Sequence, residues 1–376
     1  MMSQQSQTAR RRSLWGRTLR RVVLPLNILA IVGMILIGYT DHIDPRQHFL
    51  LPSLGLAMPM AMGVNVVFLI FWLLNRSKFA VVPIIGFLLC WGPVRRYCPV
   101  NIPSDPPKGA IKVLSFNVFM FNPWNTNQDE TNPIVDYILN SGADIVCLQE
   151  ASYDLQNPEK IYSTLASAYE YSDTVQKSSP QGDILALYSR YPIIGRERIK
   201  FDSRYNLSEA YVLNINGQKV LLVNNHLESV GLSQEDKTSF SRLVHGEMQR
   251  ERSKKESKFL LRKLGEGSEK RASQADAVAD YIVRKRNEGM SVIVCGDFND
   301  SPISYTHRRI ARGLTDCYVA TGNGPGWSYH KSSIHVRIDN ILCSSEWKPY
   351  AAKVDNTCPY SDHYPIICWL TPRGKR

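Results

Sequence analysis

Polar side chains follow apolar, strand-like segments at several places in this chain. The segment VIVCGDFND, residues 292–300, carries Asp297 and Asn299 directly after a β-prone run that stops at a glycine. Because successive strand residues face opposite sides, an extended backbone would place Asp297 and Asn299 on one face. Two polar groups at the carboxyl end of a strand serve either a loop or a ligand, and this segment alone leaves both interpretations open.

Other predicted strands also lie next to polar residues. In α/β folds, binding sites gather at strand ends because the sheet holds the roots of the loops there. Carboxylates, amides and imidazoles together suit a hard divalent cation and acid–base groups that act on a phosphate. The residues in question are Asn117, Glu150, Asn225, His226, Glu228, Asp297, Asn299, Asp339, Ser361, Asp362 and His363.

The order of these motifs along the chain is more specific than any one of them. It reads SFNV, LQE, SRYPI, NNHLE, GDFND, RIDNIL and SDHYPI. This series resembles the endonuclease/exonuclease/phosphatase superfamily, also called the DNase I-like fold, over about residues 110–372. The resemblance implies an α/β fold, a four-layer α/β/β/α sandwich of two sheets flanked by helices. It also implies cleavage of a phosphoester with Mg²⁺ or Mn²⁺.

The same resemblance implies a role for each motif residue. Glu150 is the expected principal metal ligand, with Asn117 supporting the metal or the phosphate and Asp362 as a second acidic residue at the metal. Asp297 is expected to orient or deprotonate the attacking water, and Asn299 to hold a phosphate oxygen. His363 is expected to act as a base or to stabilise charge, and Asp339 to fix the tautomer of His363. His226 is the expected general acid.

The motifs determine the substrate less well than the chemistry. The partner of His226 is not evident, and Asp183 before the strand-like segment ILAL is a further candidate. Trp327 and Tyr329 suit either stacking on a base or sugar, as substrate-binding residues, or core packing. Phe119 stands where abasic-site endonucleases usually carry an acidic residue. The region WSYHKSSIHVRIDN also lacks the Pro-Ala-Trp-Cys-Asp-Arg stretch of inositol-polyphosphate phosphatases.

We therefore expect a phosphodiester substrate, and two classes remain open. One is a nucleic acid, cleaved as by a nuclease. The other is a phospholipid, cleaved as by a sphingomyelinase or a phosphatase of the superfamily. A catalytically idle domain that only binds a partner is a further alternative, and nothing in the sequence indicates an obligate protein partner.

The residues between the motifs alternate between strand and helix patterns, which predicts the α/β class. Strands are expected over 111–118, 144–148, 184–187, 219–224, 292–295, 337–342 and 364–370, and helices over 132–140 and 274–285. Residues 229–275 interrupt this alternation with eleven basic and seven acidic residues. This insertion is either a solvated helical excursion or a basic arm that contacts an anionic substrate or lipid headgroups.

The first 96 residues differ from the rest in charge and hydropathy. They hold 11 Lys+Arg against 2 Asp+Glu, whereas the remaining 280 residues hold 34 against 32. Three stretches without charged residues, 22–40, 50–75 and 79–94, are each near the length of about 20 residues that crosses a bilayer. We expect three membrane spans rather than core helices of a soluble domain. A basic tail, 1–21, precedes them, and a proline-rich linker, 97–109, follows.

The distribution of basic residues predicts the orientation of the spans. Six arginines in the tail and the short basic connection 76–78 favour the cytoplasm, and the first connection, 41–46, suits the outside. Three spans then place the domain 110–372 on the non-cytoplasmic side of the membrane. We also expect the protein to contact membrane lipids. Arg95 and Arg96 oppose this arrangement, and a third stretch that only dips into the bilayer would leave the domain in the cytoplasm.

The eight cysteines show no CxxC spacing and so no structural zinc site. Cys147 and Cys295 lie within strand-like runs, where we expect buried free thiols.

Overall fold

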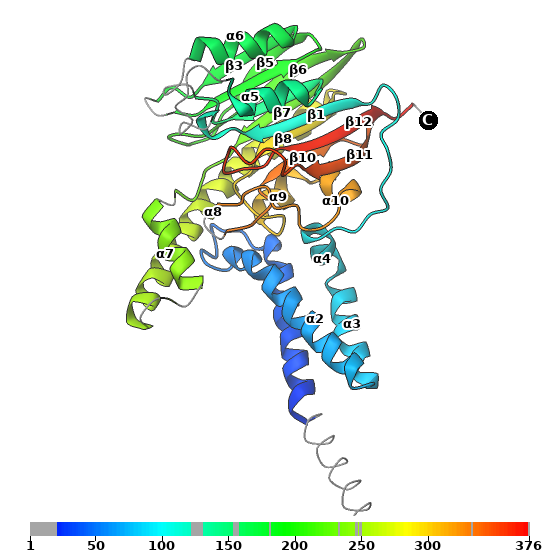
Figure 1. Ribbon diagram of the computed structural model, residues 1–376, viewed down its shortest axis with the longest axis vertical. Coiled ribbons are helices and arrows are strands. Elements are labelled where there is room, and N and C mark those ends of the chain that lie inside the picture. Colours follow the sequence, from blue (N-terminus) through cyan, green and yellow to red (C-terminus); the bar gives the residue numbers. More distant parts are fainter. Residues whose placement is uncertain are drawn as a thin grey trace, which may run out of the picture.

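The computed structural model describes residues 21–121, 131–152, 158–179, 182–231, 234–244, 247, 250–331 and 334–374 (Figure 1). The basic tail, residues 1–21, lies almost wholly outside these described residues. Two β-sheets stack face to face, and a group of apolar helices extends from one end of the stack (Figure 1).

The first sheet has six strands in the spatial order β11–β12–β1–β2–β4–β3. Strands β1 and β2 are parallel, and the other neighbouring pairs are antiparallel. The parallel pair therefore ends at the same edge of the sheet. The bounds are Ile111–Asn117 (β1), Ile145–Gln149 (β2), Tyr171–Gln176 (β3), Ile184–Ser189 (β4), Trp347–Val354 (β11) and Ile366–Pro372 (β12).

The second sheet repeats this plan, with six strands in the order β5–β6–β7–β8–β10–β9. Here β7 and β8 form the parallel pair, and their neighbours run antiparallel. The bounds are Ile193–Ile199 (β5), Leu207–Ile215 (β6), Gln218–His226 (β7), Ser291–Asp297 (β8), Thr315–Asp316 (β9) and Asp339–Cys343 (β10).

Apolar side chains fill three layers, because the central strands of both sheets are buried on both faces. Leu187, Tyr211 and Ile293 belong to the cluster between the two sheets. A second cluster joins the outer face of the first sheet to helices α5, Pro133–Asn140, and α6, Pro158–Ala168. A third joins the second sheet to helices α8, Arg250–Asn287, and α9, Tyr305–Ile310. The predicted four-layer α/β/β/α sandwich is confirmed.

Seven strands match predicted ranges to within a few residues, and helix α5 matches the prediction over 132–140. Asn132 caps α5 because its side chain accepts a hydrogen bond from the Ile134 amide at 2.9 Å. Strands β3, β5, β6, β9 and β11 and helix α6 have no predicted counterpart. Strands β3, β5, β9 and β11 lie at sheet edges, and the inner strand β6 carries the polar residues Ser208, Glu209 and Asn214, which weakens the periodic pattern.

The charged insertion is not a separate unit. It contains helix α7, Gln234–Val244, and the first part of helix α8, Arg250–Asn287. The predicted helix over 274–285 is the end of α8, so residue 275 is no structural boundary. Helix α7 and the start of α8 extend away from the sheets, on the side of the domain that carries the apolar helices (Figure 1). The short helices α9, Tyr305–Ile310, and α10, Cys317–Thr321, complete the domain.

The apolar N-terminal part contains helices long enough to cross a membrane. Arg21–His42 and Pro52–Leu74 meet the requirements of length and hydropathy for a span. The third predicted stretch is bent by 72° between Lys78–Leu89 and Trp91–Tyr97. The span Pro52–Leu74 consists of η2, Pro52–Ala57, and α2, Met58–Leu74. The third stretch comprises η3, Lys78–Ala80, α3, Val81–Leu89, and α4, Trp91–Tyr97.

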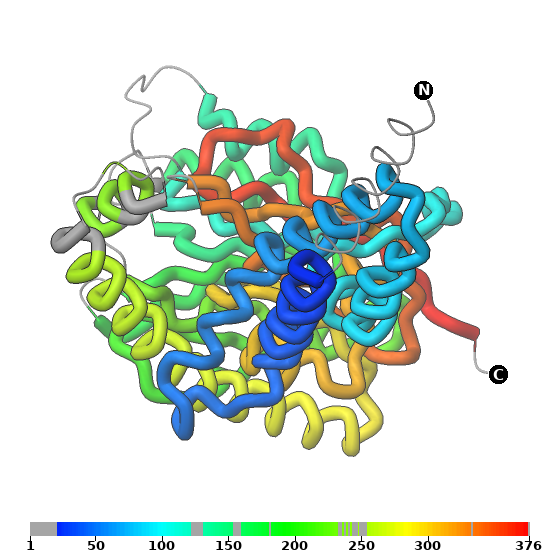
Figure 2. The backbone as a smooth tube through the Cα atoms, turned by 90° about the horizontal axis from the view of Figure 1, so that it is seen from below, coloured from blue at the N-terminus to red at the C-terminus, as the bar shows by residue number. Residues whose placement is uncertain are grey.

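We call residues 21–97 the anchor, and it packs directly against the domain. Seen from the anchor end, its helices lie beneath the sandwich (Figure 2). Gly55 of η2 touches the domain so closely that an added Cβ would lie 2.2 Å from the Ile303 carbonyl oxygen. Arg46 forms an ion pair of 2.9 Å with Asp276 of α8. Within the anchor, Arg96 contacts the buried Asp41 at 2.5 Å. These contacts hold the anchor in one position against the domain.

Residues 98–110 lie outside helices and strands apart from a turn, as expected for the predicted linker 97–109. Asn101 of this segment donates hydrogen bonds to the carbonyl oxygens of Val319, at 3.1 Å, and Gly322, at 2.5 Å. The segment is therefore fastened to helix α10. All eight cysteines are free thiols, and Cys147 and Cys295 are fully buried as predicted.

Candidate active site

The GDFND segment ends strand β8 beside β7. The register pairs His226 of β7 with Asp297 of β8, and Asp297 with Asp339 of β10. Gly296 has a φ of +127°, and a Cβ there would lie 2.0 Å from the carbonyl oxygen of Asn225. Only glycine allows this close approach of the two backbones. Three neighbouring strands thereby present His226, Asp297 and Asp339 at one edge of the sheet.

Asn299 lies at the same edge of the sheet, but a turn positions it rather than the alternation of side chains along a strand. Strand β8 ends at Asp297, and Asn299 has a φ of +51° in the left-handed region. Its amide nitrogen donates to Asp297 Oδ1 at 2.7 Å, and its side chain donates to the Leu227 carbonyl oxygen at 2.9 Å. The expectation that an extended strand aligns Asp297 and Asn299 is wrong, since a tight turn aligns them.

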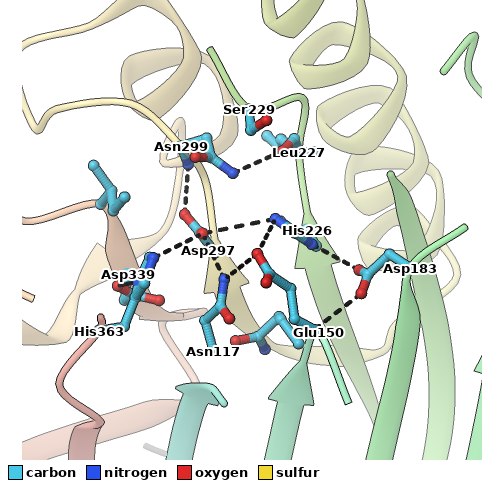
Figure 3. Close-up of polar contacts among 12 residues, drawn as sticks. Asn117, Glu150, Asp183, His226, Leu227, Ser229, Asp297, Asn299, Asp339 and His363 are labelled. Atoms are coloured by element: carbon cyan, nitrogen blue, oxygen red, sulfur yellow. Dashed lines mark hydrogen bonds and ion pairs between the residues drawn. The ribbon is translucent and has the colours of Figure 1, made fainter. Parts of the chain in front are cut away.

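The first sheet contributes Asn117 and Glu150 from the ends of its parallel pair. Asn117 lies opposite Gln149 in the register, and Glu150 follows with a φ of +50°. The side-chain nitrogen of Asn117 donates to Glu150 Oε1 at 3.1 Å and to Asp297 Oδ2 at 3.2 Å (Figure 3). Asn117 therefore links the carboxylates of the two sheets.

His363 belongs to the loop before β12 and is held by Asp339. The carboxylate of Asp339 accepts a hydrogen bond of 2.8 Å from His363 Nδ1, which directs Nε2 toward Asp297 Oδ2 at 3.7 Å. All three side chains are nearly inaccessible to solvent. Burial alone would lower the pKa of His363, but the charges of Asp339 and Asp297 outweigh it and raise the pKa to about 10.

His226 forms a second pair of the same kind, with Asp183. Its Nδ1 lies 2.7 Å from Asp183 Oδ2, and its Nε2 lies 3.8 Å from both Glu150 Oε1 and Asp297 Oδ2. Asp183 also accepts a hydrogen bond of 2.9 Å from the backbone amide of Glu150. Burial opposes the charged form of His226, yet Asp183 and the other carboxylates raise its pKa to about 10. Asp183 is thus the partner that the sequence left open.

The carboxylates of this site carry more negative charge than the two histidines can balance. Burial, followed by the neighbouring Asp339, raises the pKa of Asp297 to about 6, and burial also raises the pKa of Glu150. Ligand atoms of Asp297, Asp339 and His363 lie within 4.8 Å of one another. Asp339 Oδ1 and His226 Nε2 are buried without a hydrogen-bond partner. These oxygen-rich donors fit a hard divalent cation, which would neutralise the carboxylates.

The structure brings together most, but not all, of the predicted site residues. Asp362 is 7 % exposed and lines the same cavity as Glu150 and His363. Tyr329 lies at the site, since its ring meets the His363 ring edge-on with centroids 5.1 Å apart. Trp327 packs beside His335 instead, and it is not among the residues that line the two cavities at the site.

Two cavities border Glu150. The larger, of about 1140 Å³, includes Asp183, Arg204 and His226. The smaller, of about 270 Å³, includes Asp297 and Asn299. Glu150 therefore lines both cavities.

Comparison with known families agrees with this geometry. The model of the Endonuclease/Exonuclease/phosphatase family matches residues 114–363, which include every motif of the site from Asn117 to His363. The chain belongs to the endonuclease/exonuclease/phosphatase family. A domain of unknown function (DUF8431) matches residues 20–97, the anchor of this family member. No curated protein matches the chain.

Solved structures with the fold of this family superpose on the domain. The human nocturnin catalytic domain is 16 % identical, with a TM-score of 0.51 over 72 % of this chain and 96 % of nocturnin. An endonuclease/exonuclease/phosphatase from Beutenbergia cavernae is 15 % identical, with a TM-score of 0.51 over 70 % of this chain and 72 % of that one. Truncated Caenorhabditis elegans TDP2 is 16 % identical, with a TM-score of 0.48 over 71 % of this chain and 99 % of TDP2. The superpositions on nocturnin and on the Beutenbergia cavernae protein show a shared fold.

Proposed function

We propose that the protein is a membrane-anchored, divalent-metal-dependent phosphoesterase that hydrolyses a phosphodiester, either a nucleic acid or a phospholipid. One observation carries this proposal: two histidine–carboxylate pairs, His363–Asp339 and His226–Asp183, flank Asp297. A phosphodiester is attacked on one side and expels its leaving oxygen on the other, so two proton-transfer groups on either side of it suit this reaction.

A cation would be held by Glu150 and Asp362, with Asn117 in support. When bound, Mg²⁺ or Mn²⁺ supplies positive charge to the phosphate and to the leaving oxygen. Carboxylate and amide oxygens select such hard ions, whereas thiolates would select softer metals. The cysteines of this chain lie in the core or the anchor and do not line the two cavities at the site.

The chain's own residues supply the proton transfers. Asp297 orients the attacking water and accepts its proton, because its carboxylate lies between the two imidazoles. Asn299 holds a phosphate oxygen through a neutral dipole that does not repel the substrate. His226 is protonated at neutral pH, which suits donation to the leaving oxygen, and His363 stabilises the charge on the phosphate.

A substrate panel tests this function on the full chain in detergent micelles or nanodiscs. We expect hydrolysis of at least one of plasmid DNA, RNA, phospholipid vesicles or a chromogenic bis-ester, with loss in EDTA and recovery with Mg²⁺ or Mn²⁺. Asp297→Asn should reduce the rate about 10²-fold or more. The matched control Asp280→Asn changes a surface residue that pairs with Arg309. A chain that binds Mg²⁺ and cleaves none of these would contradict the proposal.

We also propose that the domain lies on the non-cytoplasmic side of the membrane. The contacts of Arg46 and Gly55 with the domain, and the hydrogen bond from Arg337 to the Arg96 carbonyl oxygen, support this topology, because they place one end of each anchor helix against the domain. Three crossings then separate the basic tail from the domain. A reporter that is active only in the cytoplasm, fused after Arg376, should stay inactive, and an active reporter would refute the topology.

A further inference from the structure

We propose that the substrate is a lipid phosphodiester whose apolar part enters the smaller cavity, between the membrane anchor and the catalytic residues. This inference rests on the proposed phosphoesterase function and specifies its substrate class. It follows from four features of the molecule: the walls of the cavity, its continuity with a membrane helix, the fixed docking of the anchor, and the polar cavity that also borders Glu150.

The smaller cavity has catalytic groups at one end and apolar walls from three separate segments. Asp297, Asp362 and His363 lie at the catalytic end. The anchor contributes Leu56 of η2, and α8 contributes Leu260 and Leu264. The third wall comes from the segment before β10, with Ile334, Val336 and Ile338. An apolar cavity that ends in phosphoester chemistry suits an amphiphilic substrate.

The anchor wall continues directly into a candidate membrane span. Segment η2 and helix α2 together form the apolar helix Pro52–Leu74. Apolar side chains around this entrance stay exposed to the surroundings of the protein, namely Phe49, Leu50, Leu51, Leu54 and Leu56. Exposed apolar residues at this density mark contact with a membrane. A lipid would thus pass from the bilayer into the cavity without crossing water.

Close contacts hold this wall in place. Gly55 lies against the Ile303 backbone, and Pro52 and Gly55 are buried. Arg46, just before the wall, pairs with Asp276 of α8. Because α8 supplies the opposite wall, the same contact fixes the width of the cavity between Leu56 and Leu264. Packing contacts between the anchor and the domain therefore define the walls of this cavity.

The larger cavity suits the water-soluble part of such a lipid. Its lining includes the polar residues Asp202, Ser203, Arg204 and Asn206. Glu150 and the segment 229–231 border both cavities, so a phosphate at the metal ligands would have apolar space on one side and polar space on the other. This division matches the two halves of a phosphodiester lipid.

The charges of the smaller cavity favour a lipid over a nucleic acid. A bound strand requires basic side chains along its phosphates. Among the described residues that line this cavity, Arg271 is the only arginine or lysine, and His363 belongs to the catalytic end. It is 2 % exposed and already donates to Asp300 Oδ2, at 3.1 Å, and to the Glu228 carbonyl oxygen, at 2.9 Å. Apart from the catalytic His363, a nucleic-acid backbone would find no available cation in this cavity.

Two synthetic esters that differ only in their apolar part test the inference. They are hexadecyl 4-nitrophenyl phosphate and methyl 4-nitrophenyl phosphate, both of which release nitrophenolate. For the full chain in nanodiscs, we expect kcat/KM for the hexadecyl ester to exceed that for the methyl ester at least about tenfold, because the cavity buries apolar area. DNA and RNA oligonucleotides serve as the third arm.

Variants that fill the cavity distinguish binding of the hexadecyl chain in the cavity from partitioning of the ester into the bilayer. Leu56→Trp should lower the hexadecyl-to-methyl ratio by about tenfold. Leu54→Trp is the matched control, since Leu54 belongs to the same segment but does not line the cavity, and it should keep the ratio. Leu264→Trp fills the cavity from α8 and replaces Leu56→Trp if the unfolding temperature shows that the latter does not fold.

The outcomes distinguish the two proposals. Hydrolysis of both esters with equal efficiency, or a ratio that Leu56→Trp and Leu264→Trp leave unchanged, would overturn the lipid inference and leave the phosphoesterase intact. Preferred cleavage of an oligonucleotide over the hexadecyl ester would do the same. Failure to cleave any of these substrates in the presence of Mg²⁺ or Mn²⁺ would remove the proposed function as well.

Discussion

The Nδ1 atom of His363 lies 2.8 Å from Asp339 Oδ2, while Nε2 of the same ring faces Asp297 Oδ2 at 3.7 Å. Because an ionised carboxylate only accepts hydrogen bonds, Asp339 requires a proton on Nδ1. One imidazole thus joins strands β10 and β8 at their ends, in a fixed orientation. This relationship makes the role of Asp339 testable by a change that preserves its shape.

Asp339→Asn should lower kcat about 10- to 100-fold, because the amide can donate to Nδ1 and so favour the wrong tautomer. The measurement is the rate of bis-ester hydrolysis at saturating Mg²⁺. The exposed control Asp280→Asn should retain the wild-type rate. Full activity in Asp339→Asn would show that His363 needs no partner to fix its tautomer.

His226→Gln should affect substrates according to their leaving group. A general acid matters for an alkoxide, which needs a proton, and little for nitrophenolate, which leaves without one. We expect a loss of about 10²-fold or more with an alkyl leaving group and a much smaller loss with nitrophenyl esters. Asp183→Asn should show the same pattern. Equal losses for both classes would assign His226 to another role, and His335→Gln is an exposed control.

Glu150→Gln should raise the thermal stability of the metal-free protein while it abolishes activity. Burial raises the pKa of Glu150, so its ionised form at pH 7 destabilises the fold relative to the unfolded chain. Gln removes that charge. Added Mg²⁺ should then raise the unfolding temperature of the wild type and have little effect on Glu150→Gln.

The matched control for Glu150 is Glu288→Gln, a surface residue beside Lys285. It should respond to Mg²⁺ as the wild type does. An equal Mg²⁺ response in Glu150→Gln would remove Glu150 from the set of metal ligands.

Asp316→Asn should weaken the domain at neutral pH and much less in acid. Asp316 caps α10 by accepting from the Val319 amide at 3.0 Å, and it pairs with His307 at 2.9 Å. Burial alone would raise the pKa of Asp316, but the hydrogen bond and charge of His307, with smaller effects of Arg337 and the Val319 amide, together outweigh burial and lower it. A lowered pKa stabilises the fold above the unfolded value, about 3.9, and this stabilisation disappears as the pH falls through the folded value.

Thermal unfolding from pH 7 down to pH 3 checks this dependence. At pH 7 the variant should lose about 1–3 kcal/mol in its free energy of unfolding. The difference from the wild type should shrink below about pH 4, as Asp316 becomes protonated. A difference that stays constant with pH would mean that the carboxylate charge is not what stabilises α10.

The charged segment illustrates what periodicity does not reveal. Seven basic residues within 250–263 predict an exposed helix, and α8 is that helix. The same helix also contributes Leu260 and Leu264 to the cavity, on turns that alternate with exposed charges. The sequence contains these apolar residues, but their partner Leu56 is about 200 positions away, and no local pattern predicts that contact.

The motif order predicted the family, and the resemblance to that family implied the pairing of Asp339 with His363, which the structure shows. The alternation of strand and helix segments predicted the α/β class, whereas the four-layer sandwich was implied by the resemblance. The tertiary structure alone decided the partner of His226 and the turn that places Asn299. Asp183 comes from the edge of the opposite sheet, and a left-handed residue is invisible to a pattern based on alternation.

The sequence by itself thus predicted the family, the candidate residues of the site and apolar helices long enough to span a membrane. Which surface of the domain faces that anchor was decided only in three dimensions. Local residue patterns report burial and backbone preference, whereas the packing of η2 against Ile303 and α8 depends on surfaces that exist only after both parts have folded.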